Sequence, residues 1–187
     1  YLLADKQPLK TERVNAKDLI IHLPAMAPDT VNSVIVLEMK DIKTDSVRLP
    51  DIKDIANVMR AFDGALHGSG LQYGDGKLAA YYVHGWKRGD QYISWKVRLT
   101  TAARFNVGIK YAADASSGGS YEIRIGDKVI AGKVIAEEKK QHIVSQQLDT
   151  VSLPAGEYEL TAKPVQITGT ELMKLFEITM QPIPDHL

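Results

Sequence analysis

The sequence contains no cysteine, and its 23 basic residues are balanced by 23 acidic residues. The first absence excludes a disulfide-bonded scaffold and a metal site built from thiolates. The charge balance leaves no net field that would attract nucleic acid or an anionic membrane surface, so neither is expected as a partner. Long apolar runs are also lacking, because pieces such as residues 34–37 are far shorter than the roughly 20 residues of a membrane-spanning helix. The composition therefore favours a protein that binds neutral ligands or other proteins.

Recognisable catalytic motifs are lacking as well. The chain has no Gly-x-Ser-x-Gly nucleophile elbow, no phosphate-binding loop with a lysine and no His-Glu-x-x-His zinc motif. Its five histidines, at positions 22, 67, 84, 142 and 186, have no second ligand at the spacing of a metal site. The segment 67–70 (HGSG) is predicted to be a glycine-rich turn and not a nucleophile site. We therefore predict no catalytic residue, no metal ligand and no cofactor.

What the sequence does contain is a regular alternation of apolar and polar residues in its centre. From Tyr92 to Leu99, and again from Phe105 to Tyr111, every second residue is apolar, which is the period of a half-buried β-strand. The predicted core face of these two strands carries Ile93, Trp95, Val97, Leu99, Phe105, Val107, Ile109 and Tyr111. Further short strands follow up to about residue 180, separated by turn signals every eight to twelve residues. The predicted fold class is all-β: an antiparallel β-sandwich of the jelly-roll, galactose-binding-like type, preceded by a small partial β-sheet.

Residues 1–45 are predicted to be a β segment separate from residues 46–187. Residues 19–23 alternate in polarity until Pro24 ends the strand, and the run 34–37 suits a strand covered on both faces. The polar piece 40–46 marks the boundary between the two parts. The chain begins at Tyr1 within a predicted strand, so we expect a piece of a longer polypeptide. Beyond the boundary, residues 52–62 fit both helical and strand spacing, and both alternatives stay open.

One aromatic residue falls outside the alternating strands. Trp86 lies in the charged stretch 84–90 (HGWKRGD), between two glycines. A flat indole ring can pack on the apolar face of a pyranose, while fixed polar groups hydrogen-bond the sugar hydroxyls. The candidate carbohydrate-binding patch is an exposed aromatic loop that consists of Trp86, Tyr82, His84, Arg88 and Tyr73. The alternative is that Trp86 closes the open end of the sandwich as a core residue.

Several segments resemble sequences of known families. The stretches DGALHG at 63–68, YISW at 92–95 and LPAG at 153–156, with the closing strand 172–180, resemble the galactose-binding-like or carbohydrate-binding-module-like β-sandwiches appended to bacterial glycoside hydrolases. The front segment, with LPAMAPD at 23–29 and VIVLE at 34–38, resembles the end of the C-terminal β-sandwich of family 29 α-L-fucosidases. Together the two resemblances cover nearly all of the chain.

The resemblance implies a non-catalytic module of a bacterial α-L-fucosidase-like enzyme. Its partners would be a glycan and the upstream catalytic domain of the same polypeptide, and the protein would be secreted, periplasmic or at the cell surface. Modules of this type often carry a structural calcium near the chain ends, although the acidic signature for it is lacking in this sequence. The alternative function is a structural module that packs on the catalytic domain or mediates oligomer contacts without binding sugar.

Overall fold

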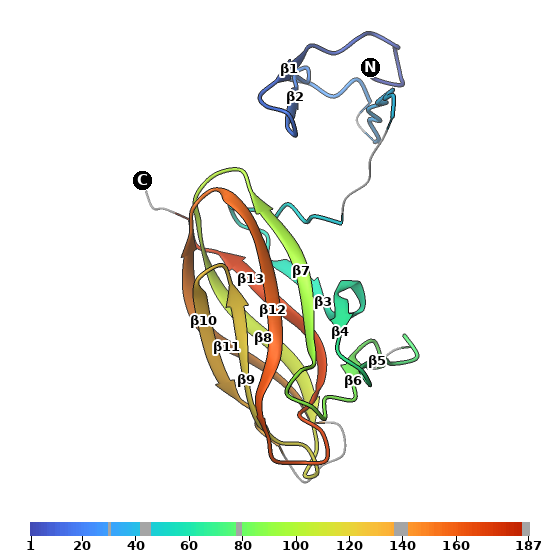
Figure 1. The fold of residues 1–187 in the computed structure, drawn as a ribbon. Helices are drawn as coiled ribbons and strands as arrows, with labels where there is room; N and C mark the ends of the chain where they lie inside the picture. Colours follow the sequence, from blue (N-terminus) through green and yellow to red (C-terminus); the bar gives the residue numbers. More distant parts are fainter. Residues whose placement is uncertain (30, 42–45, 78–79, 137–141, 185–187) are drawn as a thin grey trace. The chain divides into compact units, whose positions relative to one another are not determined.

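The structure is a computed structural model that describes residues 1–29, 31–41, 46–77, 80–136 and 142–184 (Figure 1). The chain divides into two compact units, Tyr1–Asp45 and Ser46–Leu187. Residues 42–45, within the polar piece that the sequence marks as a boundary, lie outside the described residues. In the part of the chain that is described, no helix has the length and apolar character needed to cross a membrane.

The unit Tyr1–Asp45 contains one two-stranded antiparallel sheet. Strand β1 (Thr11–Arg13) pairs with β2 (Leu19–Ile21), and Leu2 forms an isolated bridge with Ile35. The prediction that residues 34–37 form a strand covered on both faces is wrong. Val34, Ile35 and Leu37 are 42%, 39% and 55% exposed, because the described residues of this unit form no second layer against which the run can pack.

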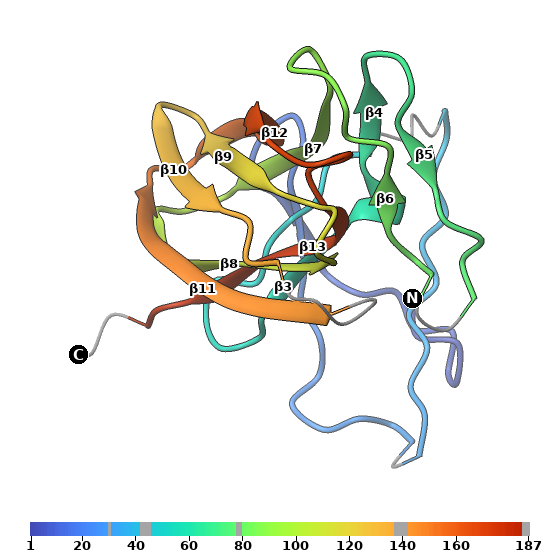
Figure 2. The same cartoon turned by 90° about the horizontal axis from the view of Figure 1, so that it is seen from below.

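The unit Ser46–Leu187 is a sandwich of two antiparallel sheets, seen as two layers in Figure 2. The first sheet has the order β10-β9-β12-β7-β4, with bounds Lys128–Lys133, Gly119–Ile125, Gly156–Ile167, Tyr92–Leu99 and Ala65–His67. The second has the order β11-β8-β13-β6-β5, with bounds His142–Leu153, Ala103–Ala113, Lys174–Pro182, Val83–His84 and Gln72–Tyr73. Strand β3 (Asn57–Arg60) also pairs with β13. The prediction of an all-β antiparallel sandwich is confirmed.

The core lies between the two sheets and is built from the residues that the alternation predicts. Trp95 is 3% exposed, and Phe105 and Tyr111 are fully buried, together with the aliphatic residues that alternate with them along β7 and β8. The Trp95 indole also donates a 2.9 Å hydrogen bond to the carbonyl of Arg60. Burying each of these large side chains stabilises the fold by roughly 2–3 kcal/mol. The prediction that these aromatic residues belong to the core is confirmed.

The segment 52–62, for which the sequence left helix and strand open, forms the strand β3 followed by the single-turn 3₁₀ helix η1 (Ala61–Asp63). Met59 and Ala61 are buried, whereas Ile55 is 67% exposed. The strand alternative holds because four residues of β13 offer a pairing edge, from Glu177 to Met180. A contact between segments so distant in sequence overrides the local helical spacing.

Candidate functional site

A pocket of about 550 Å³ lies where several loops meet at one end of the sandwich. In Figure 1 the loop that precedes β7 and the turn between β12 and β13 lie at the lower end of the sandwich. The loop after β4 contributes Ser69 and Gly70, the loop before β7 contributes Lys87 and Arg88, and the loop before β13 contributes Thr170 and Glu171. Gln72 and His84, from β5 and β6, complete the polar part of the wall. The lining is therefore rich in groups that donate and accept hydrogen bonds.

Gln91 holds two of these loops together. Its side chain is 1% exposed and uses both ends of its amide. The oxygen Oε1 accepts hydrogen bonds from the backbone N–H groups of Lys87 (2.7 Å) and Arg88 (2.8 Å). The nitrogen Nε2 donates to the carbonyls of Ser69 (2.8 Å) and Gly85 (2.9 Å). A buried amide with four partners fixes the pocket wall before any ligand arrives.

Gly85 allows the third loop to join. It has φ of 85°, and an added Cβ would overlap the carbonyl oxygen of Gly70, so only glycine fits without a shift of the backbone. The N–H of Gly85 donates to Oε2 of Glu171 at 3.0 Å, and the N–H of Leu172 donates to the carbonyl of Trp86 at 2.9 Å. The loop before β13 is thereby tied to the loop before β7.

Of the two basic side chains of the pocket, Arg88 is held by an ion pair within the described ranges and Lys87 is not. Arg88 is held by two hydrogen bonds to Asp90, at 2.9 and 3.1 Å. The hydrogen bond from Arg88 holds the pKa of the Asp90 carboxyl below its usual value, and the same contact raises the pKa of Arg88. Because both side chains are exposed, the pair orients the guanidinium and adds little to stability. Lys87 has no ion-pair partner among the residues described, so its charge stays available to a ligand.

Trp86 is not exposed, and the predicted aromatic loop is therefore wrong as a sugar-stacking surface. Its side chain is fully buried, and Nε1 donates a 3.1 Å hydrogen bond to the carbonyl of Val83. The alternative considered from the sequence describes it correctly, since Trp86 closes the end of the core. Gly85, with φ of 85°, directly precedes the buried Trp86, and Lys87 and Arg88, which follow it, are exposed.

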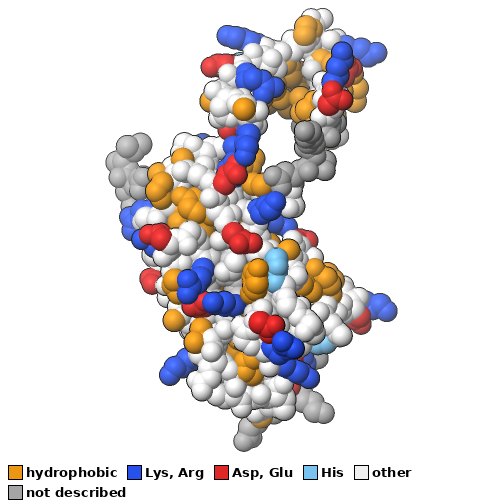
Figure 3. All heavy atoms as spheres, viewed as in Figure 1, with side chains coloured by type: hydrophobic (Ala, Val, Ile, Leu, Met, Phe, Trp, Pro, Cys, Tyr) orange, Lys and Arg blue, Asp and Glu red, His pale blue; other side chains and the backbone are white. Residues whose placement is uncertain are grey.

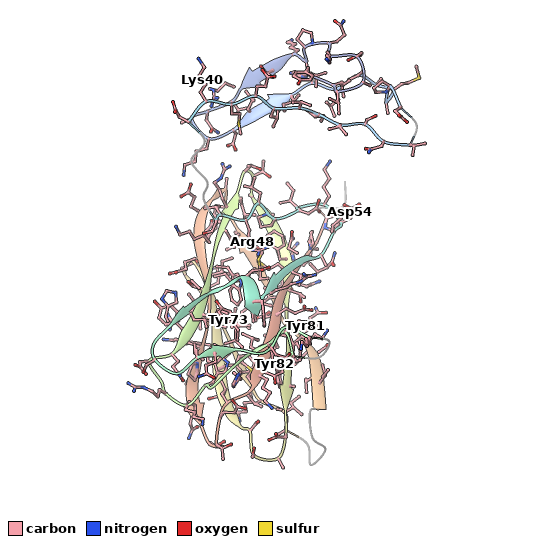
Figure 4. The ribbon with its side chains drawn as sticks, turned by 90° about the vertical axis from the view of Figure 1, so that its right-hand side faces the viewer. Lys40, Arg48, Asp54, Tyr73, Tyr81 and Tyr82 are labelled. Atoms are coloured by element: carbon pink, nitrogen blue, oxygen red, sulfur yellow. The ribbon has the colours of Figure 1, made fainter. Side chains whose placement is uncertain are left out.

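The other predicted residues separate into two groups. His84 and Arg88 line the pocket, whereas Tyr73 and Tyr82 do not. Tyr73 donates a 2.9 Å hydrogen bond to the carbonyl of Gly64. The ring of Tyr82 packs against His84, with the centroids 5.7 Å apart. Figure 4 shows Tyr73 and Tyr82 on the side of the sandwich that carries β5 and β6.

Sequence reasoning missed the residues that organise the pocket. Gln72, Gln91, Thr170 and Glu171 lie in ordinary polar stretches, and no local motif distinguishes them. Only Gly70 and Gly85 could be noticed in the sequence, since glycine is typical of sharp turns. Both have positive φ in the structure. The prediction of a glycine-rich turn at residues 67–70 agrees with the positive φ of Gly68 and Gly70.

The charged side chains are distributed without a cluster of one sign on the face that Figure 3 shows. Within the described ranges, no three His, Asp or Glu side chains gather closely enough to hold a metal ion. Figure 3 shows basic and acidic side chains interspersed over the visible face of the sandwich. The arrangement suits hydrogen bonding to a small polar ligand better than attraction of a long polyanion.

Solved structures of known proteins share the fold of the sandwich. No protein family model and no curated protein matches the sequence. Among solved structures, a family 35 carbohydrate binding module from Clostridium thermocellum has a TM-score of 0.55 and 13% identity, over 67% of this chain and 97% of the module. The GH26-CBM35 β-(1,4)-mannanase of Podospora anserina has a TM-score of 0.56 and 19% identity over 72% of this chain. The insecticidal crystal protein Cry2Aa has a TM-score of 0.60 and 6% identity over 73% of this chain.

These similarities establish the fold of the chain. The matched region spans 29% of the mannanase and 23% of the crystal protein, but nearly the whole of the isolated module. The sandwich described here thus shares its fold with the family 35 module and with regions of the mannanase and the crystal protein.

Proposed function

We propose that the unit Ser46–Leu187 is a non-catalytic carbohydrate-binding module and that its glycan binds in the loop-end pocket. The observation that carries this proposal is a polar, preformed pocket at the loop end of a sandwich that resembles family 35 modules. Its volume of about 550 Å³ lies within the usual range of small-molecule sites. A terminal sugar unit of a glycan is a ligand of the right size and polarity.

The pocket would hold the sugar by hydrogen bonds. The Lys87 ammonium and the Gln72 amide are donors, the Glu171 carboxylate is an acceptor, and a sugar hydroxyl can serve either role. Gln91 keeps the loops in place, so less conformational entropy is lost when a ligand binds. Because Trp86 is buried, ring stacking does not contribute in this pocket.

The parent protein is a separate part of the proposal. We propose an α-L-fucosidase-like glycoside hydrolase, exported from the cell, in which this chain follows the catalytic domain. Support comes from the sequence of residues 23–38 and from the apolar surface of the unit Tyr1–Asp45. Its exposed large apolar side chains include Leu3, Val14, Leu19, Ile20, Leu23, Met26, Val31, Val34, Ile35, Leu37 and Met39. A surface of this kind is typical of one that packs against another domain.

The same surface favours a second candidate function, a structural module that joins the catalytic domain to its neighbours. The two candidates place their essential residues in different units. A carbohydrate-binding module depends on the pocket residues, whereas a structural module depends on the apolar side chains before residue 46. Substitutions in each unit therefore separate the two functions.

The test is a glycan array screened with the whole chain, followed by calorimetry with the strongest ligand. We expect Lys87→Ala combined with Gln72→Ala to weaken binding by about tenfold or more, which corresponds to about 1.4 kcal/mol. The matched control is Lys128→Ala combined with Gln166→Ala, which removes the same residue types from exposed positions elsewhere. The control is expected to bind like the unsubstituted chain. No ligand on the array, or equal affinity for both double variants, would overturn the proposal.

A further inference from the structure

A second hollow, of about 250 Å³, lies on the outer face of the sheet that contains β11, β8 and β13. It extends over the three neighbouring strands β11, β8 and β13. Along β8, Phe105, Val107 and Ile109 point into the core, so Asn106, Gly108 and Lys110 belong to the opposite face. The hollow is therefore separate from the loop-end pocket, with which it shares no lining residue.

The hollow exists because Gly108 has no side chain at its centre. A Cβ at this position would lie 2.6 Å from Oγ1 of Thr179 and 3.2 Å from the carbonyl oxygen of Gln146. The Thr179 hydroxyl and the Gln146 carbonyl thus lie close to the glycine, and larger side chains surround it. Glycine within a strand interior weakens a sheet, and it marks a place where something approaches the backbone closely.

Neutral hydrogen-bonding groups surround Gly108 in the hollow. Ser145, Gln147 and Thr179 line the hollow, and their side chains have no hydrogen-bond partner within the described ranges. Two further lining amides are fixed in position: Asn106 accepts a 2.9 Å hydrogen bond from Thr150, and Gln181 donates a 3.0 Å hydrogen bond to the carbonyl of Asp54. The face combines preoriented amides with unpaired groups, as a binding surface requires.

One side chain of the hollow also reaches an aromatic cluster that does not itself line the hollow. Lys110 lines it, and the Lys110 ammonium also lies 5.9 Å from the centroid of the Phe176 ring. The rings of Tyr81 and Tyr82 pack against Phe176, with their centroids 5.1 and 5.5 Å from the centroid of the Phe176 ring. Figure 4 labels both tyrosines, which lie close together. Tyr82, which the sequence placed in a sugar-binding patch, packs against Phe176 as well as against His84, and it does not line the hollow.

The chemistry of the surface indicates the class of ligand. Strand β8 is paired on both edges, so its backbone N–H and C=O groups are not free to bind an added peptide strand. A ligand on this face must be recognised through side-chain amides and hydroxyls, and hydroxyl groups match both their donors and their acceptors. The one lysine and one glutamate of the lining, Lys110 and Glu177, balance each other in charge. These features favour a neutral, hydroxyl-rich chain.

We propose that the outer face of the β11-β8-β13 sheet, centred on Gly108, is a second carbohydrate-binding surface, which takes an internal stretch of a neutral polysaccharide. The loop-end pocket, of about 550 Å³, is walled by loops, whereas the hollow of about 250 Å³ lies on a sheet face, past which a longer chain can continue. The proposal rests on the geometry of the sheet face and holds independently of whether the loop-end pocket binds a sugar.

The test is affinity gel electrophoresis of the whole chain in gels that contain galactomannan, xyloglucan or arabinogalactan. We expect at least one of these polymers to retard the unsubstituted chain. The double variant Gln147→Ala/Thr179→Val removes two unpaired polar groups and keeps a β-branched residue in β13, so its fold is expected to persist. We expect it to lose most of the retardation. The matched control, Gln166→Ala/Thr161→Val, makes the same changes in β12 of the opposite sheet and is expected to run like the unsubstituted chain.

The outcomes distinguish this surface from the loop-end pocket. Lys87→Ala/Gln72→Ala is expected to weaken binding of short oligosaccharides on the array and to leave a substantial part of the polymer retardation. If polymers retard neither the unsubstituted chain nor the variants, or if Gln147→Ala/Thr179→Val runs like its control, the second surface does not exist. If instead the loop variant binds the array normally while the face variant loses retardation, the proposed function of the pocket fails and the second surface stands.

Discussion

The side-chain amide of Gln91 donates a 2.9 Å hydrogen bond to the backbone carbonyl of Gly85. The same nitrogen donates to Ser69, so one buried side chain connects the loop after β4 to the loop before β7. Gly85 in turn binds Glu171 through its N–H group, which connects the loop before β13. The pocket therefore depends on one glycine position at which three loops meet.

Gly85→Ala is expected to damage both stability and binding. Its positive φ and the overlap of the added Cβ with the Gly70 carbonyl force the backbone to shift, at a cost of about 1–3 kcal/mol. The shift also breaks the register of the hydrogen bonds to Gln91. Urea unfolding measures the first effect, and calorimetry with the array ligand measures the second.

Gly89→Ala is the matched control in the same loop. A Cβ at this position has nothing within 4 Å, and its φ is not in the left-handed range. Its stability is expected to stay within about 0.5 kcal/mol of the unsubstituted chain. A control variant that is destabilised as strongly as Gly85→Ala would show that the loop as a whole, and not the close approach at Gly85, limits stability.

Both tryptophans are expected to be shielded from solvent in the native chain. Trp86 is fully buried and Trp95 is 3% exposed, so acrylamide should quench the native fluorescence weakly and the urea-unfolded chain strongly. Trp86→Phe should lower the free energy of unfolding by about 1–3 kcal/mol, since it removes ring volume and leaves the carbonyl of Val83 without its donor. Strong quenching of the native chain would contradict the burial of Trp86.

Two buried tyrosines are expected to respond with opposite signs when their hydroxyls are removed. The Tyr121 hydroxyl is buried and has no hydrogen-bond partner among the described residues, so Tyr121→Phe should raise the free energy of unfolding by about 1 kcal/mol. The Tyr111 hydroxyl accepts a 2.8 Å hydrogen bond from the N–H of Ile135, so Tyr111→Phe should lower it by about 1 kcal/mol. Burial raises the pKa of both phenols. Denaturant titrations of the two variants decide the matter, and changes of the same sign would refute this assignment.

Glu122 is expected to make stability depend on pH in the acidic range. Its carboxylate accepts a 2.7 Å hydrogen bond from Arg124, which is the main cause that lowers its pKa below 4.5, and lies 2.8 Å from the Lys163 ammonium. Because the pKa is lower in the folded chain than in the unfolded chain, the contribution is complete above about pH 4.5 and is lost as the pH falls through the folded value.

The measurement compares the unsubstituted chain with Glu122→Gln in urea across this range. The difference between their free energies of unfolding should be about 1 kcal/mol at neutral pH, since both cationic partners are substantially exposed. It should shrink as the medium becomes acidic. A difference that stays constant down to the lowest pH at which the chain folds would mean that the ion pairs do not stabilise the fold.

The strands could be predicted where their pattern is local. Strand β7 has the bounds expected from the alternation, and β8 extends the expected strand by two residues at each end, because a period of two is encoded in consecutive residues. The run 34–37 carries a strand-like local pattern but forms no strand of the sheet β1-β2. Its β-branched residues favour a strand, but pairing and burial depend on a partner that the unit Tyr1–Asp45 does not provide.

The candidate site could be predicted only in part. His84 and Arg88 were found because they lie in a charged loop, but the same reasoning assumed that Trp86 shared their exposure. The burial of Trp86 is fixed by Val83 nearby and by Leu172, which is distant in sequence. Gln91 and Glu171 could not be found at all, because their roles arise when loops far apart in the chain meet.

The most direct test of the central claim maps the ligand onto the backbone. The ¹⁵N-labelled chain is titrated with L-fucose, D-galactose, D-mannose and D-glucuronate, and with the strongest array ligand, while amide chemical shifts are recorded. The account predicts saturable shifts at the amides of residues 69–72, 84–91 and 169–172, and loss of those shifts in Lys87→Ala/Gln72→Ala. Saturable shifts that bypass these loops, or none with any of the sugars up to high millimolar concentration, would contradict it.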